Sequence, residues 1–487
     1  MYISKKLKKM IAASLTVSGL TLMPAVVPAF YPINTIVDLP IVSVTHAKVT
    51  TYTGVGEDYA NEYESQEIAK QRARSKAIRQ ATEQAGVYLQ TYSKSINGRI
   101  TNDEINAITS NSYKIDGEPV YERIVQQVTN VSTVIIWKAT VQVNVDDAEI
   151  QDWLKLNSMD RSTIVNQNNI LQESIAANDK QVENLRQRAM NASTDEERAQ
   201  IRAEYQQVDS EFLANQLLEE GNRLAYQGDY NGAVAKYNEA LQYNPNDVIA
   251  YNNRGNAYAD LQNYEAAIMD YNKAIELNPN LSEAYNNRGL TYAYMGNYNE
   301  AIADLTKAIE LNPNYAAAYN NRGNTYDEMG NHNAAINDYN KAIELNPNNA
   351  DYYNNRGVVY TKMSNYTQAI TDYNKAIELN PNDDYAYNNR GVAYQELKQY
   401  KKALVDYNKA LTLMEHPLIY ANRGEVHYYL KNYKQAIDDL NKAIELGIEG
   451  TDLAEALYYR GLAYEKLGDN TRAQADFDKA KQLGYTE

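Results

Sequence analysis

The first fifty residues combine a basic start with a long uncharged run. Four lysines form that start: Lys5, Lys6, Lys8 and Lys9. Residues 10–37 carry no charge, and a basic start followed by an apolar stretch and small residues is typical of a secretory signal. The sequence therefore predicts a signal peptide over residues 1–47, cut after Ala29 or Ala47, and a protein of the periplasm, cell envelope or medium. An uncleaved membrane anchor is the alternative.

Alternating hydrophobicity predicts a long β-strand over residues 131–145. Every second residue there is apolar except Thr133, so one face of the strand is expected to be buried. Residues 119–128 are its predicted hairpin partner. Upstream, alanines at near-helical spacing predict one long helix over residues 64–92 with a slim packing face.

A Gly-x-Gly pair, Gly54 and Gly56, precedes this helix. A phosphate-binding loop would need a third glycine and a βαβ context, so a glycine-bent strand end is the preferred interpretation. The strand, the glycines, the helix "QEIAKQRARSKAIRQATEQAGVY" and the hairpin together resemble the small envelope domain of LPP20-type lipoproteins and the N-terminal domain of a flagellar assembly protein. This resemblance covers residues 48–156, a small α+β domain, and implies an extracytoplasmic assembly or scaffolding role.

Residues 157–213 are predicted to form a helical connector. Apolar residues fall on the a and d positions of one heptad frame: Ile164, Leu171, Ile175, Val182, Leu185 and Ala189. Thr194 and Glu197 form a capping box that starts a second helix. A coiled-coil hairpin and a single spacer arm both fit this pattern.

The remaining chain, residues 214–487, repeats one unit eight times, mostly with a period of 34 residues. Each unit has one glycine at the same place: Gly221, Gly255, Gly289, Gly323, Gly357, Gly391, Gly424 and Gly461. An alanine lies twelve positions after each glycine and a bulky residue sixteen after it, which allows two helices to pack closely. Asn-Pro-Asn ends the second helix in five units.

This pattern closely resembles the tetratricopeptide repeat family. The resemblance implies a mainly α fold, a right-handed α-solenoid of helix pairs whose concave face is lined by the first helix of each unit. Two positions depart from the pattern. Asn470 replaces an aromatic residue in the last unit, and residues 414–417 replace Asn-Pro-Asn, where we expect the superhelix to change pitch.

Charge covariation between units predicts ion pairs between the two helices of each unit. The residue before the glycine and the residue fifteen after it always have opposite charges, and both signs are reversed in the first unit. The predicted structural pairs are Glu220–Lys236, Arg254–Asp270, Arg288–Asp304, Arg322–Asp338, Arg356–Asp372, Arg390–Asp406, Arg423–Asp439 and Arg460–Asp476. Exposed pairs of this kind contribute ~0–1 kcal/mol each, so we expect a structural role only.

A row of asparagines two and three residues before the glycine is the candidate peptide-binding site: Asn252, Asn253, Asn286, Asn287, Asn320, Asn321, Asn354, Asn355, Asn388, Asn389 and Asn422. Asparagine inside a helix costs ~0.5 kcal/mol relative to alanine, and its amide matches the donor and acceptor of a peptide backbone. The row is similar to repeat arrays whose concave asparagine ladder binds peptide main chain. Recent duplication, which also copies neutral residues, is the alternative explanation.

Specificity is expected from first-helix residues that differ between units. They lie five residues after the glycine: Asp260, Tyr294, Glu328, Lys362, Glu396 and Tyr429. Their acids and tyrosines suit a basic or aromatic-bearing segment. The clamp of lysine and arginine with which other arrays of this family grip a partner's terminus is not predicted, because the corresponding positions include Leu218, Glu283 and Ala317.

Composition excludes several kinds of chemistry. The 487 residues carry a net charge of −16, which argues against a nucleic-acid surface. Without cysteine there is no disulfide, zinc–thiolate site or thiol nucleophile, and the four histidines lack metal-ligand spacing. We therefore expect no catalytic residues, no metal and no cofactor, and membrane contact only through an uncleaved signal.

Taken with the repeats, these features predict a secreted or cell-envelope interaction scaffold whose concave surface binds extended protein segments. The alternative is a structural assembly factor that docks on an envelope machine through its N-terminal α+β domain. An enzyme has no support, because the sequence contains no catalytic triad, no metal-ligand set and no phosphate loop.

Overall fold

The computed structural model describes residues 49–61, 63–95, 101–127, 133–146 and 158–485. The predicted signal peptide lies outside these residues. The chain divides after Ala284 into two compact parts, called the N-terminal part and the C-terminal part below. Within the described ranges, no helix combines the length and the apolar character needed to cross a bilayer.

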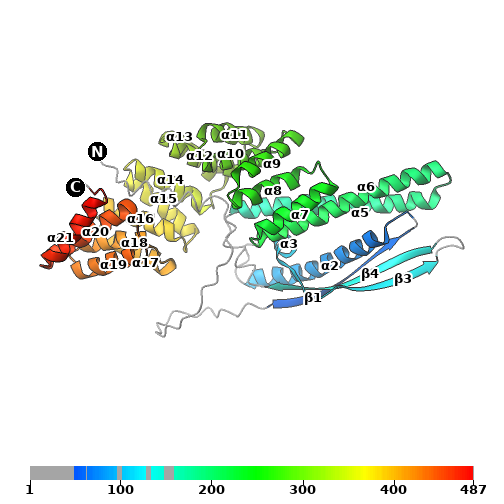
Figure 1. The fold of residues 1–487 in the computed structure, drawn as a ribbon, viewed down its shortest axis with the longest axis horizontal. Coiled ribbons are helices and arrows are strands. Elements are labelled where there is room, and N and C mark those ends of the chain that lie inside the picture. Colours follow the sequence, from blue (N-terminus) through cyan, green and yellow to red (C-terminus); the bar gives the residue numbers. More distant parts are fainter. Residues whose placement is uncertain (1–48, 62, 96–100, 128–132, 147–157, 486–487) are drawn as a thin grey trace. The chain divides into compact units, whose positions relative to one another are not determined.

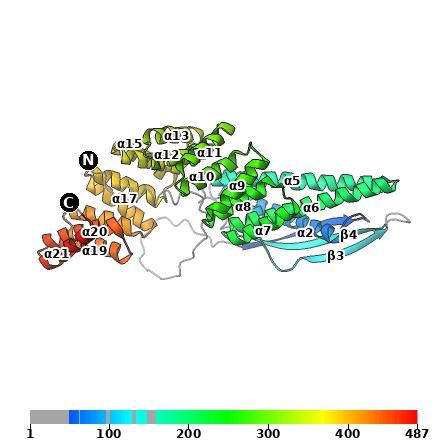
Figure 2. The same ribbon diagram turned by 45° about the horizontal axis from the view of Figure 1, so that its top comes forward.

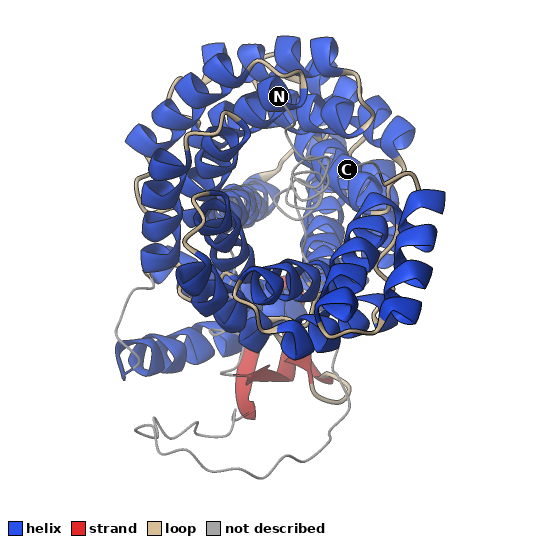
Figure 3. Ribbon diagram, turned by 90° about the vertical axis from the view of Figure 1, so that its left-hand side faces the viewer, coloured by secondary structure: helices blue, strands red, loops and turns tan. Residues whose placement is uncertain are grey.

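The N-terminal part begins with a four-stranded antiparallel sheet. Its strands are β1 (Val49–Ala60), β2 (Lys114–Ile115), β3 (Val120–Gln127) and β4 (Thr133–Asp146). β4 is central and pairs with β1 along one edge and with β2 and β3 along the other. The β3–β4 pairing confirms the predicted hairpin. Among the described residues, β-structure is confined to this sheet (Figure 3).

Helix α2 (Gln66–Ser95) covers one face of the sheet (Figure 1). Its alanines pack on alternate residues of β4 that are at most 2% exposed, and α3 (Asn102–Ser112) adds Ile105 and Ile108 to the same core. Gly54 and Gly56 lie in the middle of β1, and a Cβ on Gly56 would lie 2.1 Å from the carbonyl oxygen of Ala73. The predicted strand-end role of these glycines is therefore wrong, because they allow the helix to approach the strand closely.

Helices α5 (Ser158–Asn191) and α6 (Asp195–Tyr226) form an antiparallel hairpin (Figure 2). Thr194 caps α6 in the predicted capping box with Glu197, and the predicted apolar seam is buried from Leu171 to Leu185. The hairpin, of the two predicted arrangements, is the one observed. α6 continues without a break beyond residue 213, so the connector and the first repeat share one helix.

A buried ionic network fixes this hairpin to the sheet domain. Arg186 of α5 lies 3.0 Å from Glu64 and 3.1 Å from Asp58. Arg72 of α2 binds Glu64 over 3.1 Å and Asp209 of α6 over 2.6 Å. Burial raises the pKa of Glu64 above its usual range, although both arginines act in the opposite direction.

From α6 onward the chain consists of consecutive helix pairs, which confirms the predicted fold class. The N-terminal part contains α6, α7 (Tyr230–Tyr243), α8 (Val248–Asp260) and α9 (Tyr264–Leu277). The C-terminal part contains α10 (Ser282–Tyr294), α11 (Tyr298–Leu311), α12 (Ala316–Glu328), α13 (His332–Leu345), α14 (Ala350–Lys362), α15 (Tyr366–Leu379), α16 (Asp384–Glu396), α17 (Tyr400–Leu413), α18 (Pro417–Tyr429), α19 (Tyr433–Glu445), α20 (Gly450–Lys466) and α21 (Asn470–Gln482).

Each pair is held together by the glycine and the bulky residue that define the repeat. The ring of Tyr373 is 1% exposed, and a Cβ on Gly357 would lie 2.7 Å from it. A larger side chain would therefore push the two helices apart. In the C-terminal part, the first helices α12, α14, α16 and α18 contact one another in succession more closely than the second helices do. The first helices therefore line the inner, concave face.

Candidate functional site

The predicted ion pairs all lie between the two helices of one pair. The Arg–Asp distances are 2.6–2.7 Å, and Lys236 lies 3.3 Å from Glu220. The carboxylates are more buried than predicted, with Asp372 only 2% exposed. In Arg322, hydrogen bonds to Asp338 raise the pKa of the guanidinium against the effect of burial. These pairs fix the geometry of each unit and leave the concave face to other side chains.

The asparagines bind one another from unit to unit. The second asparagine of a unit donates from Nδ2 to Oδ1 of the first asparagine of the preceding unit over 3.0–3.2 Å, in the pairs Asn321–Asn286, Asn355–Asn320, Asn389–Asn354 and Asn422–Asn388. Within a unit, Asn320 donates to Asn321 over 3.4 Å. In the N-terminal part of the chain, Asn253 donates a hydrogen bond to Asn222 over 2.9 Å. From Asn286 to Asn422 the row is thus a hydrogen-bonded ladder across successive first helices.

Burial limits what this ladder can present to a partner. Asn287 is half-buried, and the other ten asparagines are between 1% and 7% exposed. The compensation that their poor helix propensity requires is therefore supplied by the ladder itself. A bound segment could meet these amides only through their small exposed area, and the peptide-binding role stays a prediction.

A second polar row satisfies the buried tyrosines of the second helices. The hydroxyl of Tyr339 donates to Asn324 over 2.6 Å and that of Tyr271 to Asn256 over 2.8 Å. The units that have Leu305 or Phe477 in place of this tyrosine carry a leucine in place of the asparagine. The other units differ: those with Tyr373 and Tyr407 have Val358 and Val392 at the asparagine position, and the tyrosine hydroxyls are hydrogen-bonded to Thr361 and Gln395 instead. The unit with Leu440 has Glu425 there.

The predicted specificity residues lie at the end of each first helix. Tyr294 and Tyr429 are 37% and 41% exposed, Glu328 and Glu396 are also exposed, and Asp260 and Lys362 are half-buried. These six residues are called the variable row below. Burial raises the pKa of Glu328, with Lys362 acting in the opposite direction.

Tyr429 and Glu396 lie beside the start of a neighbouring second helix. The ring of Tyr429 stacks on Tyr400, with centroids 4.8 Å apart, and Tyr366 donates from its hydroxyl to Glu396 over 3.2 Å. Lys362 forms an ion pair with Asp327 of the preceding unit. Asp327 thereby balances the charge of the lysine, and the exposed members of the row are acids and tyrosines.

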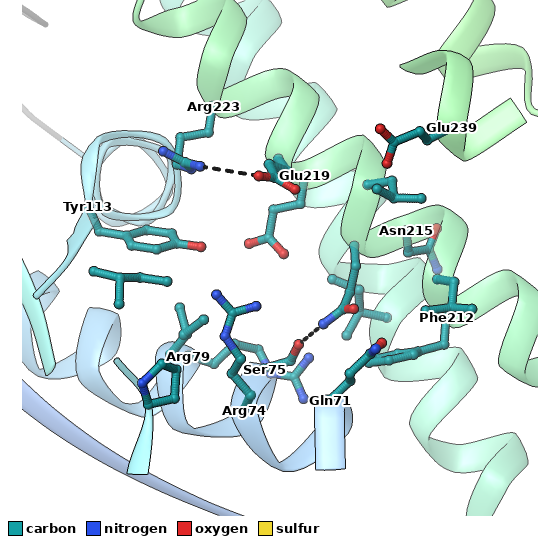
Figure 4. Close-up of a pocket in the computed structure, with 18 of the residues that line it drawn as sticks. Gln71, Arg74, Ser75, Arg79, Tyr113, Phe212, Asn215, Glu219, Arg223 and Glu239 are labelled. Atoms are coloured by element: carbon teal, nitrogen blue, oxygen red, sulfur yellow. Dashed lines mark hydrogen bonds and ion pairs between the residues drawn. The ribbon is translucent and has the colours of Figure 1, made fainter. Parts of the chain in front are cut away.

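A cavity of about 510 Å3 lies in the N-terminal part, between the sheet domain and the helices α6 and α7. Figure 4 shows Tyr113, Arg74, Arg79 and Glu219 around it. Burial raises the pKa of Glu219, while Arg79 and Arg223 act to lower it. Both signs of charge line this cavity, so it indicates no single class of ligand.

The geometry defines a stacked helix-pair solenoid, and no cluster of metal-ligating side chains occurs among the residues described. Models described as TPR repeat or tetratricopeptide repeat match residues 221–262, 323–364, 248–281, 282–315, 350–383, 385–416, 417–446, 305–337 and 455–483. Together they span more than half of the chain, which belongs to the tetratricopeptide repeat family. Proteins of this family are protein–protein interaction scaffolds.

Several solved structures are similar over the repeats. A tetratricopeptide repeat protein from Parabacteroides merdae is 21% identical over 51% of this chain and 99% of its own, with a TM-score of 0.42. MamA is 32% identical over 33% of this chain and 93% of its own (TM-score 0.30). YrrB, described as a TPR protein with an unusual peptide-binding site, is 25% identical over 37% and 92% (TM-score 0.31).

No curated protein matches the chain. The residues matched by family models lie between 221 and 483. The resemblance of residues 48–156 to LPP20-type lipoproteins and to a flagellar assembly domain therefore stays a prediction.

Proposed function

We propose that this protein is an extracytoplasmic interaction scaffold, secreted or held in the cell envelope, whose first-helix face binds extended protein segments. The observation that carries this proposal is the contrast between a constant frame and the variable row. Glycine, alanine, ion pair and asparagine ladder recur from unit to unit, whereas the exposed residue at the end of each first helix differs. A surface that varies on an invariant frame is suited to reading the side chains of a partner.

The chemistry of the variable row favours a basic partner. Glu328 and Glu396 are exposed acids, and Asp260 is a half-buried one. Lys362 is paired with Asp327 and acts on Glu328 as well, but one lysine against three acids leaves the row with a net negative charge. A row of carboxylates and tyrosines attracts arginine and lysine through charge and through the faces of the rings.

The asparagine ladder has a supporting role in this proposal. Its side chains set the spacing of successive first helices and so hold Glu328, Lys362, Glu396 and Tyr429 of the variable row in one register. Contact with the main chain of a bound segment would use the 7% of Asn354 and Asn355 that stays exposed.

The extracytoplasmic location rests on the sequence. Residues 1–47 have the layout of a secretory signal, and the chain contains no cysteine. N-terminal sequencing of the protein purified from its source, together with cell fractionation, tests this location. An intact Met1 in a cytosolic fraction would contradict it.

A second candidate, an assembly factor that docks through its N-terminal domain, is favoured by apolar side chains that are exposed, among the described residues, on one face of the sheet. Val55 and Val120 both lie opposite Thr140, and Ile124 lies opposite Ile136. They share the face opposite α2, where Val120 is 67% exposed. Such a face suits contact with another protein.

Site-specific photocrosslinking tests the first proposal and separates it from the second. A benzophenone amino acid replaces Glu396 in the variable row, Val405 on the exposed side of α17, or Val120 on the sheet. We expect crosslinks to a protein of the cell envelope from position 396 and none from position 405. Crosslinks from position 120 alone would favour the assembly factor, and equal crosslinking from 396 and 405 would contradict the concave site.

A further inference from the structure

The first helices of the last two units are rich in tyrosine. Where five units have Asn-Asn before Arg-Gly, the eighth has Tyr458 and Tyr459 on α20, and the seventh ends its first helix with Tyr428 and Tyr429. Together with Tyr400 at the start of α17, these residues form what is called the tyrosine cluster below. Three different units contribute to it.

The rings of the tyrosine cluster are in direct contact. Tyr429 stacks on Tyr400 with an interplanar angle of 6°. Tyr428 and Tyr459 meet edge to face at 5.7 Å, and the rings of Tyr429 and Tyr459 lie 5.9 Å apart. The hydroxyls of Tyr429 and Tyr459 are 2.9 Å apart. The rings are therefore held in place by one another and do not have to be ordered by a ligand.

Carboxylates surround these rings. Glu425, one turn before Tyr429 on α18, is 6% exposed. Burial, followed by the charges of Glu425 and Glu396, raises the pKa of Tyr400. Burial and the charge of Glu425 also raise the pKa of Tyr459. The cluster thus lies in a negative field.

The nearby cations of α18 are engaged elsewhere. Arg423 binds Asp439 over 2.6 Å, and His427 lies 3.8 Å from the same carboxylate. These groups belong to the interface between α18 and α19. They therefore offset the field at the tyrosine cluster little, because Asp439 already balances the arginine.

The cluster is accessible along the variable row. Tyr429 is 41% exposed and is the last member of that row, next to the exposed Glu396 of the preceding unit. An extended segment along the first helices would therefore reach the cluster.

We propose that the tyrosine cluster binds one cationic side chain, arginine or lysine, of the extended segment that the scaffold holds. This inference rests on the proposed function and adds the chemical class of the ligand. Aromatic faces attract a cation, most strongly when the site is partly desolvated, and Glu425 and Glu396 add a charge that an uncharged side chain could not use. Proline and aromatic side chains, which also pack on tyrosine rings, are the competing ligands in the test.

The test uses the full chain and fluorescein-labelled decapeptides of glycine, serine and alanine with one central residue: arginine, lysine, glutamine, proline, phenylalanine or glutamate. We expect the arginine and lysine peptides to bind at least ten-fold more tightly than the glutamine peptide. Tyr429→Ala is expected to lower the affinity for the arginine peptide by about 5–30-fold, and to leave the glutamine peptide unchanged. Tyr429→Phe, which keeps the ring, is expected to retain most of the preference.

Tyr243→Ala is the control, because Tyr243 on the second helix α7 is similarly exposed, at 45%, and lies outside both the variable row and the tyrosine cluster. It should leave the ratio of arginine to glutamine binding unchanged. If Tyr429→Ala lowers the melting temperature, Glu396→Gln provides the measurement instead, with an expected loss of a few-fold in the preference. Both effects should shrink as salt is raised.

Three results would overturn the inference: equal binding of the arginine and glutamine peptides, tightest binding of the proline or phenylalanine peptide, or equal losses from Tyr429→Ala and Tyr243→Ala. The proposed function fails separately. Absence of crosslinks from position 396 with an intact arginine preference would leave a cation site without a segment-binding face. Crosslinks without any arginine preference would leave the scaffold and remove the cation site.

Discussion

The side-chain amide of Asn355 donates a hydrogen bond over 3.1 Å to Oδ1 of Asn320, 35 residues earlier in the chain. Both side chains are at most 7% exposed. Asn355→Ala would leave a buried carbonyl oxygen without this donor, so we expect a loss of about 1–3 kcal/mol in the free energy of unfolding. Urea unfolding followed by circular dichroism measures it.

The control for this prediction is Asn348→Ala, in the exposed turn after α13, which should change stability by less than about 0.5 kcal/mol. If the bond couples the two residues, Asn320→Ala combined with Asn355→Ala will cost less than the sum of the single changes. Strictly additive costs would show that the ladder does not stabilise the stack through this bond.

The buried hydroxyl of Tyr339 and its partner Asn324 give a second prediction. Tyr339→Phe removes the 2.6 Å hydrogen bond and leaves a buried amide oxygen, so we expect a loss of about 1–2 kcal/mol. Adding Asn324→Leu should recover most of that loss, because the unit with Phe477 carries Leu462 at the corresponding position.

The matched control is Tyr326→Phe, which changes a half-buried tyrosine on α12, the helix that carries Asn324. We expect it to change the free energy of unfolding by less than about 0.5 kcal/mol. Thermal and urea unfolding of all four proteins measures the set. A double variant that is less stable than Tyr339→Phe alone would disprove the coupling.

The sequence was sufficient to predict the helix pairs and the ion pairs within them. A period of 34 residues repeated through most of the array leaves few alternatives to stacked hairpins. The reversed signs at Glu220 and Lys236 identify the partner within the unit, because pairing with a neighbouring unit would bring like charges together. Covariation of this kind is direct information on contact.

The asparagine ladder and the tyrosine cluster could not be predicted in the same way. Asn320 and Asn355 are identical in kind to their counterparts in other units, so no change in one reveals its contact with the other. The tyrosine cluster joins residues of three units, and its only signal is Tyr458 and Tyr459 at places where asparagine is usual. Likewise, the Gly-x-Gly of β1 does not reveal which helix packs on it.

The pH dependence of stability should contain a contribution from Asp383, the N-cap of α16. It accepts a 3.0 Å hydrogen bond from the amide of Ala386, yet burial raises its pKa to about 6, above the value of about 4 in an unfolded chain. A raised folded-state pKa stabilises below the unfolded value and loses this effect as pH rises through about 6. The wild type should therefore lose about 1–3 kcal/mol between pH 4 and pH 7 that Asp383→Asn does not lose.

Asn is as good an N-cap as Asp, so this variant separates titration from capping. The control is Asp469→Asn at the N-cap of α21, where the backbone bond from Arg472 lowers the pKa of the carboxyl. Its contribution has the opposite sign, present above the unfolded pKa and lost as pH falls. Identical pH profiles for Asp383→Asn and the wild type would contradict the prediction.

The attachment of the helical hairpin to the sheet domain should depend on Arg186. Its side chain is 5% exposed and pairs with Glu64 and Asp58, which are 0% and 1% exposed. Arg186→Ala leaves two carboxylates buried without this cation, and we expect a loss of about 3–5 kcal/mol. The sheet domain, the hairpin and the first repeats should then lose their common unfolding transition, which differential scanning calorimetry resolves.

Arg188, two residues further along α5, provides the control because its pair with Glu204 lies at the surface, with the arginine 43% exposed. Arg188→Ala should change stability by about 0.5 kcal/mol or less. Burial already raises the pKa of Glu64, and loss of Arg186 raises it further. Protonation then relieves the buried charge, so the deficit of Arg186→Ala should be smaller at pH 5 than at pH 8. Equal deficits at the two pH values would show that the arginine acts through packing and not through its charge.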